Sequence, residues 1–479
     1  MTDDIYANYI KGIDKSIASP EKVITRESIP KVDLIIENGN VIIPDQGILK
    51  TNVYVKDGRV YALGNMPDIG AKKTINAVGK YVCPGIIDPH VHLGMFADLE
   101  MDMNSETKAA LVGGVTTTGV FIGGDNSHFK TIDKYKEAID NNAYTDILPH
   151  LVIGTNEQKN EMREYAYSLG ITSFKIYMNG IPEITNSVTD DFILDVFEQI
   201  KVIDKNAIVC CHTENNHIVS RAVNVMKKLY AKDMTIDKWA DTHPAMAEVE
   251  AINRIAYLAE LSKTPVYLVH ISSKEGIERL RQIKPFNKYI NVETTSPYLG
   301  VCDKDCKDAK FKMEPPIRKR EDQNALWSAL DDGVIDTIGT DNVCETLKEK
   351  RFGENFWDVV PGYSVIESHL AVTLTEGVVK RNKSIEKVIK CMTKKPAELF
   401  GIYPKKGTIL PGSDADIVLF DIKKSDIIEP SKQVSRTDFS IYEGMEVFGS
   451  SCMTIKEGKV VVQNGIVLES GRTGKMLTR

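Results

Sequence analysis

The sequence lacks the features that mark membrane, nucleic-acid-binding and secreted proteins. No apolar run reaches the roughly 18 residues that a membrane-spanning helix needs. No long basic run occurs and the formal net charge is −7, so neither nucleic acid nor a membrane is an expected partner. The first residues also lack the basic-then-apolar order of a signal peptide. We therefore expect a cytoplasmic protein.

Cysteine and histidine are both scarce. The eight cysteines lie mostly in apolar stretches and form no paired framework, which indicates reduced thiols. Cys302 and Cys306 form a Cys-x3-Cys pair, but no second pair completes the four ligands of a structural zinc site. Only nine histidines occur, so their positions in the chain are informative.

Both ends of the chain have β-strand character. Residues 1–30 are polar and mixed, and we expect them to form an N-terminal extension. Short alternating strands follow over 31–80, with hairpin signals at Asn38-Gly39 and Asp57-Gly58. Similar strands recur over 401–470. We predict that the two ends pair into one composite β-sandwich domain, and two separate β-caps are the alternative.

Residues 81–400 have a different sequence pattern, in which apolar runs alternate with amphipathic segments of helical length. Continuous apolar strands alternating with helices are typical of a parallel sheet in an α/β protein. Eight runs favour a (β/α)8 barrel of the TIM type over an open sheet. The runs are YVCPGIIDPHVHL, GVTTTGVFIGG, DILPHLVIG, ITSFKIYM, AIVCCHTE, PVYLVHISS, YINVETTSPYL and VIDTIGTDN.

Polar side chains recur at the ends of these predicted strands. In a (β/α)8 barrel the carboxyl ends of the strands form the functional face. Four of the nine histidines fall there, and two of them are spaced i, i+2, which places both rings on one face of a strand. The residues at these ends are His90, His92, Lys175, His212, His270 and Asp341.

Four imidazoles and one carboxylate suit a borderline divalent ion, with Zn²⁺ preferred over Mn²⁺, Co²⁺ or Fe²⁺. Lys175 is the unusual member, because an ammonium group would repel metal cations. A buried lysine can be neutral and nucleophilic, and its reaction with CO₂ would give a carbamate able to bridge two metals. The alternative is that Lys175 is salt-bridged or begins a loop.

The motifs PGIIDPHVH, SFKIYM, HTEN, VHISSKEG and GTDN, flanked by DLIIENGNVI and GSDADIVLFD, resemble the amidohydrolase superfamily. Within it the chain is most similar to the cyclic-amide hydrolases, dihydropyrimidinase and hydantoinase, with allantoinase and dihydroorotase as more distant relatives. The resemblance implies that Lys175 is N6-carboxylysine bridging two metals. His90, His92 and Asp341 would hold one metal, and His212 and His270 the other. It also implies a homotetramer or homodimer.

The resemblance implies a mechanism as well. A hydroxide that bridges two metal ions attacks the carbonyl of a cyclic amide or ureide, such as a dihydropyrimidine or hydantoin ring. Asp341 takes the proton and passes it to the leaving ring nitrogen, first as general base and then as general acid. The product is an N-carbamoyl amino acid or a related amide acid.

The candidate substrate contacts depart from the family pattern. Gly94 stands where dihydroorotases carry an arginine, which argues against that substrate. Gly180 replaces the tyrosine of hydantoinases, and Tyr177 is a candidate substitute or a packing residue. Glu314 replaces a small residue and is either a substrate contact or solvated. Gly362 ends a Val-Pro-Gly segment that replaces the family's Pro-Asn-Gly. We expect conserved chemistry on a non-standard substrate.

Two other hypotheses about function are compatible with the sequence. The same metal site is compatible with an allantoinase or with an amidohydrolase that acts on an acyclic amide. A non-catalytic scaffold, like the neuronal relatives of dihydropyrimidinase, is a different class of function. Those relatives have lost metal ligands, whereas all six candidate positions are intact here.

Overall fold

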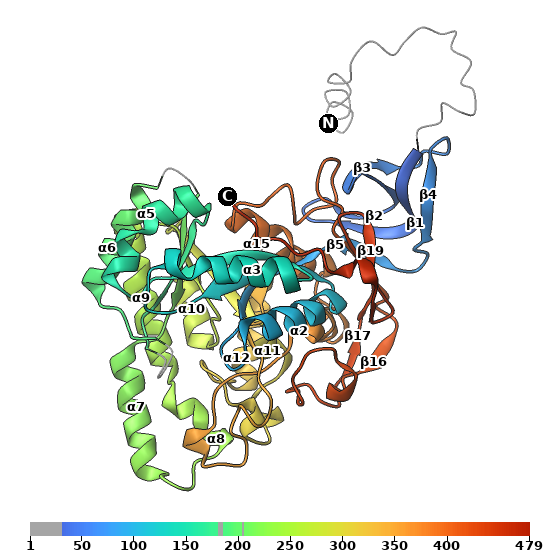
Figure 1. Ribbon diagram of the computed structural model, residues 1–479. Helices are drawn as coiled ribbons and strands as arrows, with labels where there is room; N and C mark the ends of the chain where they lie inside the picture. Colours follow the sequence, from blue (N-terminus) through green and yellow to red (C-terminus); the bar gives the residue numbers. More distant parts are fainter. Residues whose placement is uncertain (1–30, 181–184, 204–205) are drawn as a thin grey trace.

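Two nine-stranded β-sheets and a shell of helices make up most of the computed structural model, which describes residues 31–180, 185–203 and 206–479 (Figure 1). The predicted extension, residues 1–30, lies outside the described residues. One sheet is surrounded by helices. The other contains strands from both ends of the chain, blue and red in Figure 1. No helix in the described ranges is long and apolar enough to cross a bilayer.

The helix-covered sheet is parallel and closes on itself. Its strand order follows the chain from β6 to β13, and β14 returns to pair with β6. β13 and β14 are the halves of an eighth strand, separated by Thr340 and Asp341, so this strand pairs with both the seventh and the first. The predicted (β/α)8 barrel is confirmed. Its strands are β6 (Ile86–His92), β7 (Val115–Ile122), β8 (Asp146–Val152), β9 (Ser173–Tyr177), β10 (Ile208–His212), β11 (Val266–Leu268), β12 (Ile290–Thr295), β13 (Thr337–Gly339) and β14 (Asn342–Val343).

Helices between successive strands cover the outside of the barrel (Figure 1). In α10, for example, Ile277 and Leu280 are buried, and the Ser273 hydroxyl caps the helix by accepting the Gly276 N–H at 2.9 Å. The longer helices are α2 (Leu99–Val112), α3 (Ile132–Asn142), α6 (Asp190–Lys201), α7 (Asn216–Leu229), α9 (Ala245–Ser262), α10 (Lys274–Ile283), α12 (Arg320–Asp331) and α14 (Ile385–Met392). The shorter ones are α4 (Asn156–Asn160), α5 (Met162–Glu164), α8 (Ile236–Trp239), α11 (Ser296–Gly300), α13 (His369–Thr373) and α15 (Lys394–Leu399).

The second sheet joins the two ends of the chain. Its order is β20-β19-β18-β15-β5-β1-β2-β3, with β4 pairing to β1, and the β5–β15 pair connects the two halves. Its strands are β1 (Lys31–Ile43), β2 (Gly47–Lys56), β3 (Arg59–Gly64), β4 (Gly70–Asn76), β5 (Tyr81–Pro84), β15 (Ile417–Phe420), β18 (Ser451–Lys456), β19 (Lys459–Gln463) and β20 (Ile466–Val467). A separate ribbon pairs β16 (Ser425–Ile427) with β17 (Glu446–Phe448).

Two local expectations differ from the structure. We expected the barrel to begin at residue 81, but β5 belongs to the second sheet and the first barrel strand begins at Ile86. Gly85 lies between the two strands, and glycine fits there because a Cβ atom would lie 2.1 Å from the Thr116 hydroxyl oxygen. The predicted hairpin at Asn38-Gly39 was wrong. Asn38 has φ +63° and lies at a bulge within β1, whereas Asp57-Gly58 forms the predicted turn.

A buried ion cluster ties the barrel floor to the second sheet. Asp146 begins β8, and its two oxygens contact Lys456 Nζ at 2.7 Å and Lys406 Nζ at 2.8 Å. Lys406 Nζ also lies 2.6 Å from Asp416 Oδ2. Burial acts to raise the pKa of Asp146, but the two lysines outweigh it and lower that pKa. Two lysines from the C-terminal part of the chain therefore meet at one carboxylate of the barrel strand β8.

Replacing Lys406 with Met should lower the free energy of unfolding by about 3–5 kcal/mol, because the buried carboxylates of Asp146, Asp414 and Asp416 lose a counter-ion. Lys405→Met is the matched control, since Lys405 is exposed and adjacent in sequence. Urea unfolding of both variants, followed by circular dichroism, measures the difference. If the two variants unfold at the same urea concentration, the cluster does not stabilise the junction.

Candidate metal centre

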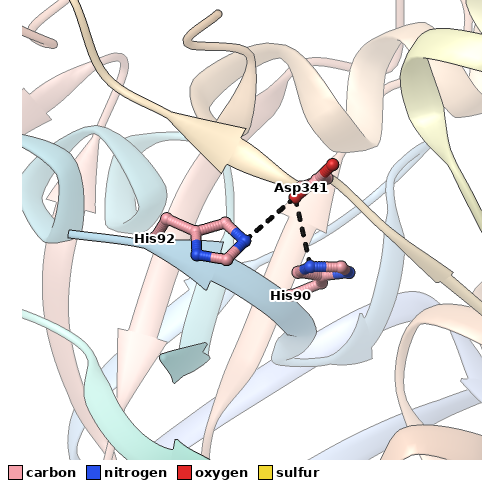
Figure 2. A group of neighbouring side chains, drawn as sticks. All are labelled: His90, His92 and Asp341. Atoms are coloured by element: carbon pink, nitrogen blue, oxygen red, sulfur yellow. Dashed lines mark ion pairs between the residues drawn. The ribbon is translucent and has the colours of Figure 1, made fainter. Parts of the chain in front are cut away.

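Three predicted ligands meet at the carboxyl end of the barrel. His90 and His92 come from the end of β6, and Asp341 lies in the break between β13 and β14. Figure 2 shows both rings directed at the carboxylate, with His90 Nε2 3.1 Å and His92 Nε2 3.2 Å from Asp341 Oδ1. Their possible ligand atoms all lie within 4.8 Å of one another. The i, i+2 spacing on a strand accounts for the convergence of the two rings.

The backbone of Asp341 is held in an unusual conformation. Its φ is +56°, a left-handed value that costs a non-glycine residue free energy and persists only where the surroundings impose it. Both neighbours are fixed by buried carboxylates. Thr340 donates from its hydroxyl to Asp88 at 2.6 Å and from its N–H at 3.0 Å, while the Asn342 amide donates to Glu106 at 3.2 Å. These bonds position the Asp341 carboxylate.

Charges in this group are strongly coupled. Burial acts to raise the pKa of Asp341, but His90 and His92 outweigh it and hold that pKa well below its ordinary range. Burial acts in the opposite direction on His90, where the carboxylates of Glu293 and Asp341 prevail and raise the pKa to about 9. The Asp341 carboxylate is therefore ionised at neutral pH, and its negative charge lies beside both rings.

The other three predicted residues lie beside the first group but are not part of its 4.8 Å cluster. Lys175 is near the end of β9, His212 ends β10, and His270 follows β11. The ring centroid of His270 is 4.5 Å from that of His212 and 5.5 Å from that of His90, so the two sets of rings are continuous. His270 also has a left-handed backbone, with φ +43°.

Lys175 is buried, with 1% of its surface exposed. Its Nζ lies 4.6 Å from the ring centroid of Phe121 and 4.9 Å from that of Tyr177. Burial lowers its pKa, because the charged form loses hydration. The salt-bridge alternative finds no support, since no carboxylate in the described ranges forms an ion pair with this amine.

Two buried glutamates orient the histidines. Glu293 Oε1 lies 3.0 Å from His90 Nδ1, and Glu214 Oε2 lies 3.0 Å from His212 Nε2. Each carboxylate therefore takes one ring nitrogen and leaves the other for a cation, an arrangement common around metal-binding histidines. With four imidazoles and a carboxylate, this donor set fits a borderline divalent ion. Sequence reasoning missed both glutamates, although Glu214 follows His212 by two residues.

A cleft of about 1020 Å³ opens beside these residues and is lined by His92, Tyr177 and Glu314 among others. The Tyr177 ring stacks against that of His212 with 5.7 Å between centroids. Two of the three predicted substrate contacts are thus at the cleft. Gly362 is not among its lining residues, and its carbonyl instead accepts a hydrogen bond from Lys350 at 2.7 Å.

Comparison with known proteins gives a consistent result. Residues 81–461 match the amidohydrolase family. The chain is 30% identical to an L-hydantoinase of Paenarthrobacter aurescens, covering 93% of this chain and 98% of that one. It is 31% identical to a D-hydantoinase of Ralstonia pickettii, covering 94% and 99%. The structure of an L-hydantoinase (dihydropyrimidinase) from Arthrobacter aurescens superposes with a TM-score of 0.86 at 29% identity, covering 94% of this chain and 100% of that one.

Replacing Glu293 with Gln should weaken metal affinity by about 10- to 100-fold, because His90 loses the carboxylate that orients its ring. Glu354→Gln is the control, since Glu354 is exposed and the glutamate carboxylates that face the histidine rings are those of Glu293 and Glu214. Competition with a chromogenic chelator measures the affinity of each variant. Equal affinities for the two variants would rule out this role for Glu293.

Proposed function

We propose that this chain, which belongs to the amidohydrolase family, is a metal-dependent hydrolase that opens a cyclic amide or ureide. The observation that carries the proposal is the convergence of His90, His92 and Asp341 at the carboxyl end of the barrel, beside a cleft large enough for a small ring. Relatives of nearly full length bear hydantoinase names, which favours cyclic amides over other amidohydrolase substrates.

The proposed centre holds two divalent ions, preferably Zn²⁺. His90, His92 and Asp341 would hold one ion through nitrogen and oxygen atoms that already face one another. His212 and His270 would hold the other, and the engagement of His212 Nε2 by Glu214 leaves its Nδ1 for the metal. When bound, the two cations would lower the pKa of a water molecule and polarise the substrate carbonyl.

Lys175 is proposed to lie between the two ions as N6-carboxylysine. Two cations beside a buried ammonium would be strongly repulsive, whereas a carbamate supplies an anion at the same place. In the reaction the neutral amine attacks CO₂, a nitrogen–carbon bond forms and one proton leaves. Burial of the amine among Phe121 and Tyr177, without a carboxylate partner in the described ranges, favours the neutral form that this step requires.

Asp341 is the proposed general base and acid. Its carboxylate accepts a proton from the attacking water and delivers it to the ring nitrogen as the C–N bond breaks. Fixed neighbours on both sides keep the carboxylate from turning away between the two transfers. Tyr177 and Glu314 line the cleft and are proposed to contact the substrate. The product is an open-chain amide acid, such as an N-carbamoyl amino acid.

Other predictions stay open. An allantoinase or acyclic-amide activity uses the same residues and is the second candidate, whereas a non-catalytic scaffold would not need the intact ligand set. A homodimer or homotetramer and a cytoplasmic location remain predictions. So do the domain limits, with residues 31–80 and 401–470 in one composite β-sandwich domain and residues 81–400 in the barrel domain.

The wild-type protein should hydrolyse at least one of dihydrouracil, hydantoins, allantoin, dihydroorotate or other cyclic imides. Asp341→Asn should abolish this turnover, because an amide cannot accept the proton. Ring opening is followed by the loss of ultraviolet absorbance, and metal content is measured on the same samples. Activity on none of these rings with metals bound would overturn the cyclic-amide assignment. Near-normal turnover by metal-loaded Asp341→Asn would overturn the role of Asp341.

A further inference from the structure

One wall of the cleft is the segment 356–362, which we call the cleft segment. It begins with the short helix η8 (Phe356–Asp358), and its residues 357–361 line the cleft. Just beyond it, the Tyr363 carbonyl accepts the Val343 N–H at 2.9 Å. Val343 lies in β14, two residues after Asp341, so the cleft segment connects the barrel strand of the metal centre to the substrate side of the cleft.

Two buried lysines hold this segment by its carbonyl groups. Lys312 Nζ donates to Phe356 O at 2.9 Å and also to Val359 O. Lys350 Nζ donates to Val360 O at 3.0 Å and to Gly362 O at 2.7 Å. With the Trp357 carbonyl, which lies 3.4 Å from Lys312 Nζ, five carbonyls of a seven-residue segment therefore accept hydrogen bonds from two ammonium groups.

The backbones of the lysines add to this attachment. The Lys350 carbonyl accepts the Val360 N–H at 3.0 Å, and the Lys312 carbonyl accepts the Gly362 N–H at 3.3 Å. The two lysines are also joined, since Lys350 Nζ lies 3.3 Å from the Lys312 carbonyl. The cleft segment is thus fixed to both lysines through main chain and side chain.

Burial of two ammonium groups costs free energy, because the charged groups lose hydration. Lys312 and Lys350 are 3% and 0% exposed, yet among the described residues only one carboxylate, that of buried Glu345, pairs with them, at 2.8 Å from Lys350 Nζ. Lys312 has aromatic neighbours instead, with Nζ 4.5 Å from the ring centroid of Trp239. Burial lowers the pKa of Lys312 to about 8. Core stability would be served better by apolar side chains, so the charges point to a need for a defined segment geometry.

We propose that Lys312 and Lys350 are positioning residues that fix the cleft segment and thereby set how tightly the substrate is held. This inference rests on the proposed function, because it concerns the substrate of the same site. Lys312 itself lines the cleft, but within the described ranges neither lysine forms a hydrogen bond or ion pair with a residue of the metal centre, and both ammonium groups donate to carbonyls of the segment. Their removal should therefore affect substrate binding more than the chemical step.

The test compares Lys312→Met with Lys348→Met, an exposed lysine in the same part of the chain. Loss of charged hydrogen bonds to the segment should accelerate amide exchange over residues 356–363 by about tenfold or more, with exchange in the barrel strands unchanged. KM for the ring that the wild type opens should rise by about tenfold, with kcat and metal content nearly unchanged, because the lost interaction is shared by ground and transition states. Lys348→Met should match the wild type in each measurement.

Lys350→Met leaves Glu345 without a partner and is expected to destabilise the fold, so the double variant Lys350→Met with Glu345→Gln is used to test the second lysine. It should repeat the exchange and KM changes of Lys312→Met. Unchanged exchange over the cleft segment in both variants would overturn the inference, as would faster exchange with an unchanged KM. Loss of kcat together with metal would also overturn it, by showing a general structural role. If the wild type opens no ring, the proposed function fails, while the exchange comparison still decides whether the lysines hold the segment.

Discussion

The contact of the Asp341 carboxylate with the His90 and His92 imidazoles is the interaction on which the rest of the site depends. The two imidazoles come from the first barrel strand and the carboxylate from the last, so the contact exists only when the barrel is closed. The Asp341 N–H donates to the His90 carbonyl at 2.9 Å, within this closure. The left-handed backbone at Asp341 costs roughly 1–3 kcal/mol, which the buried bonds between Thr340 and Asp88 offset. Closure of the barrel therefore also brings the three candidate metal ligands together.

Buried lysines have different partners at the two ends of the barrel. On the floor, Lys406 and Lys456 face Asp146 at 2.8 and 2.7 Å, an arrangement of opposite charges that serves stability. Toward the mouth, Lys175 lies among aromatic rings and Lys312 among rings and carbonyls. Among the described residues, these two buried lysines without a carboxylate partner thus lie near the cleft, at the end where (β/α)8 barrels carry their function.

Much of the fold and of the ligand set could be predicted from the sequence, because buried parallel strands read as apolar runs and strand ends gather at one face. The conformation at Asn38-Gly39 could not, since an Asn-Gly sequence suits a bulge with one left-handed residue, here Asn38, as well as a hairpin turn. Glu293 and Glu214 were missed because their significance depends on which histidine nitrogen they face across strands. Gly362 resembles a substrate contact in sequence, but Lys350 holds its carbonyl away from the cleft lining.

The most direct test of the account is a crystal structure of the protein grown with Zn²⁺ and bicarbonate, with anomalous scattering recorded at the zinc edge. Two anomalous peaks are expected, one against His90, His92 and Asp341 and one against His212 and His270. Density for a carboxylate on Lys175 Nζ is expected between them. A single peak, or two peaks with an unmodified amine at Lys175, would contradict the central claim.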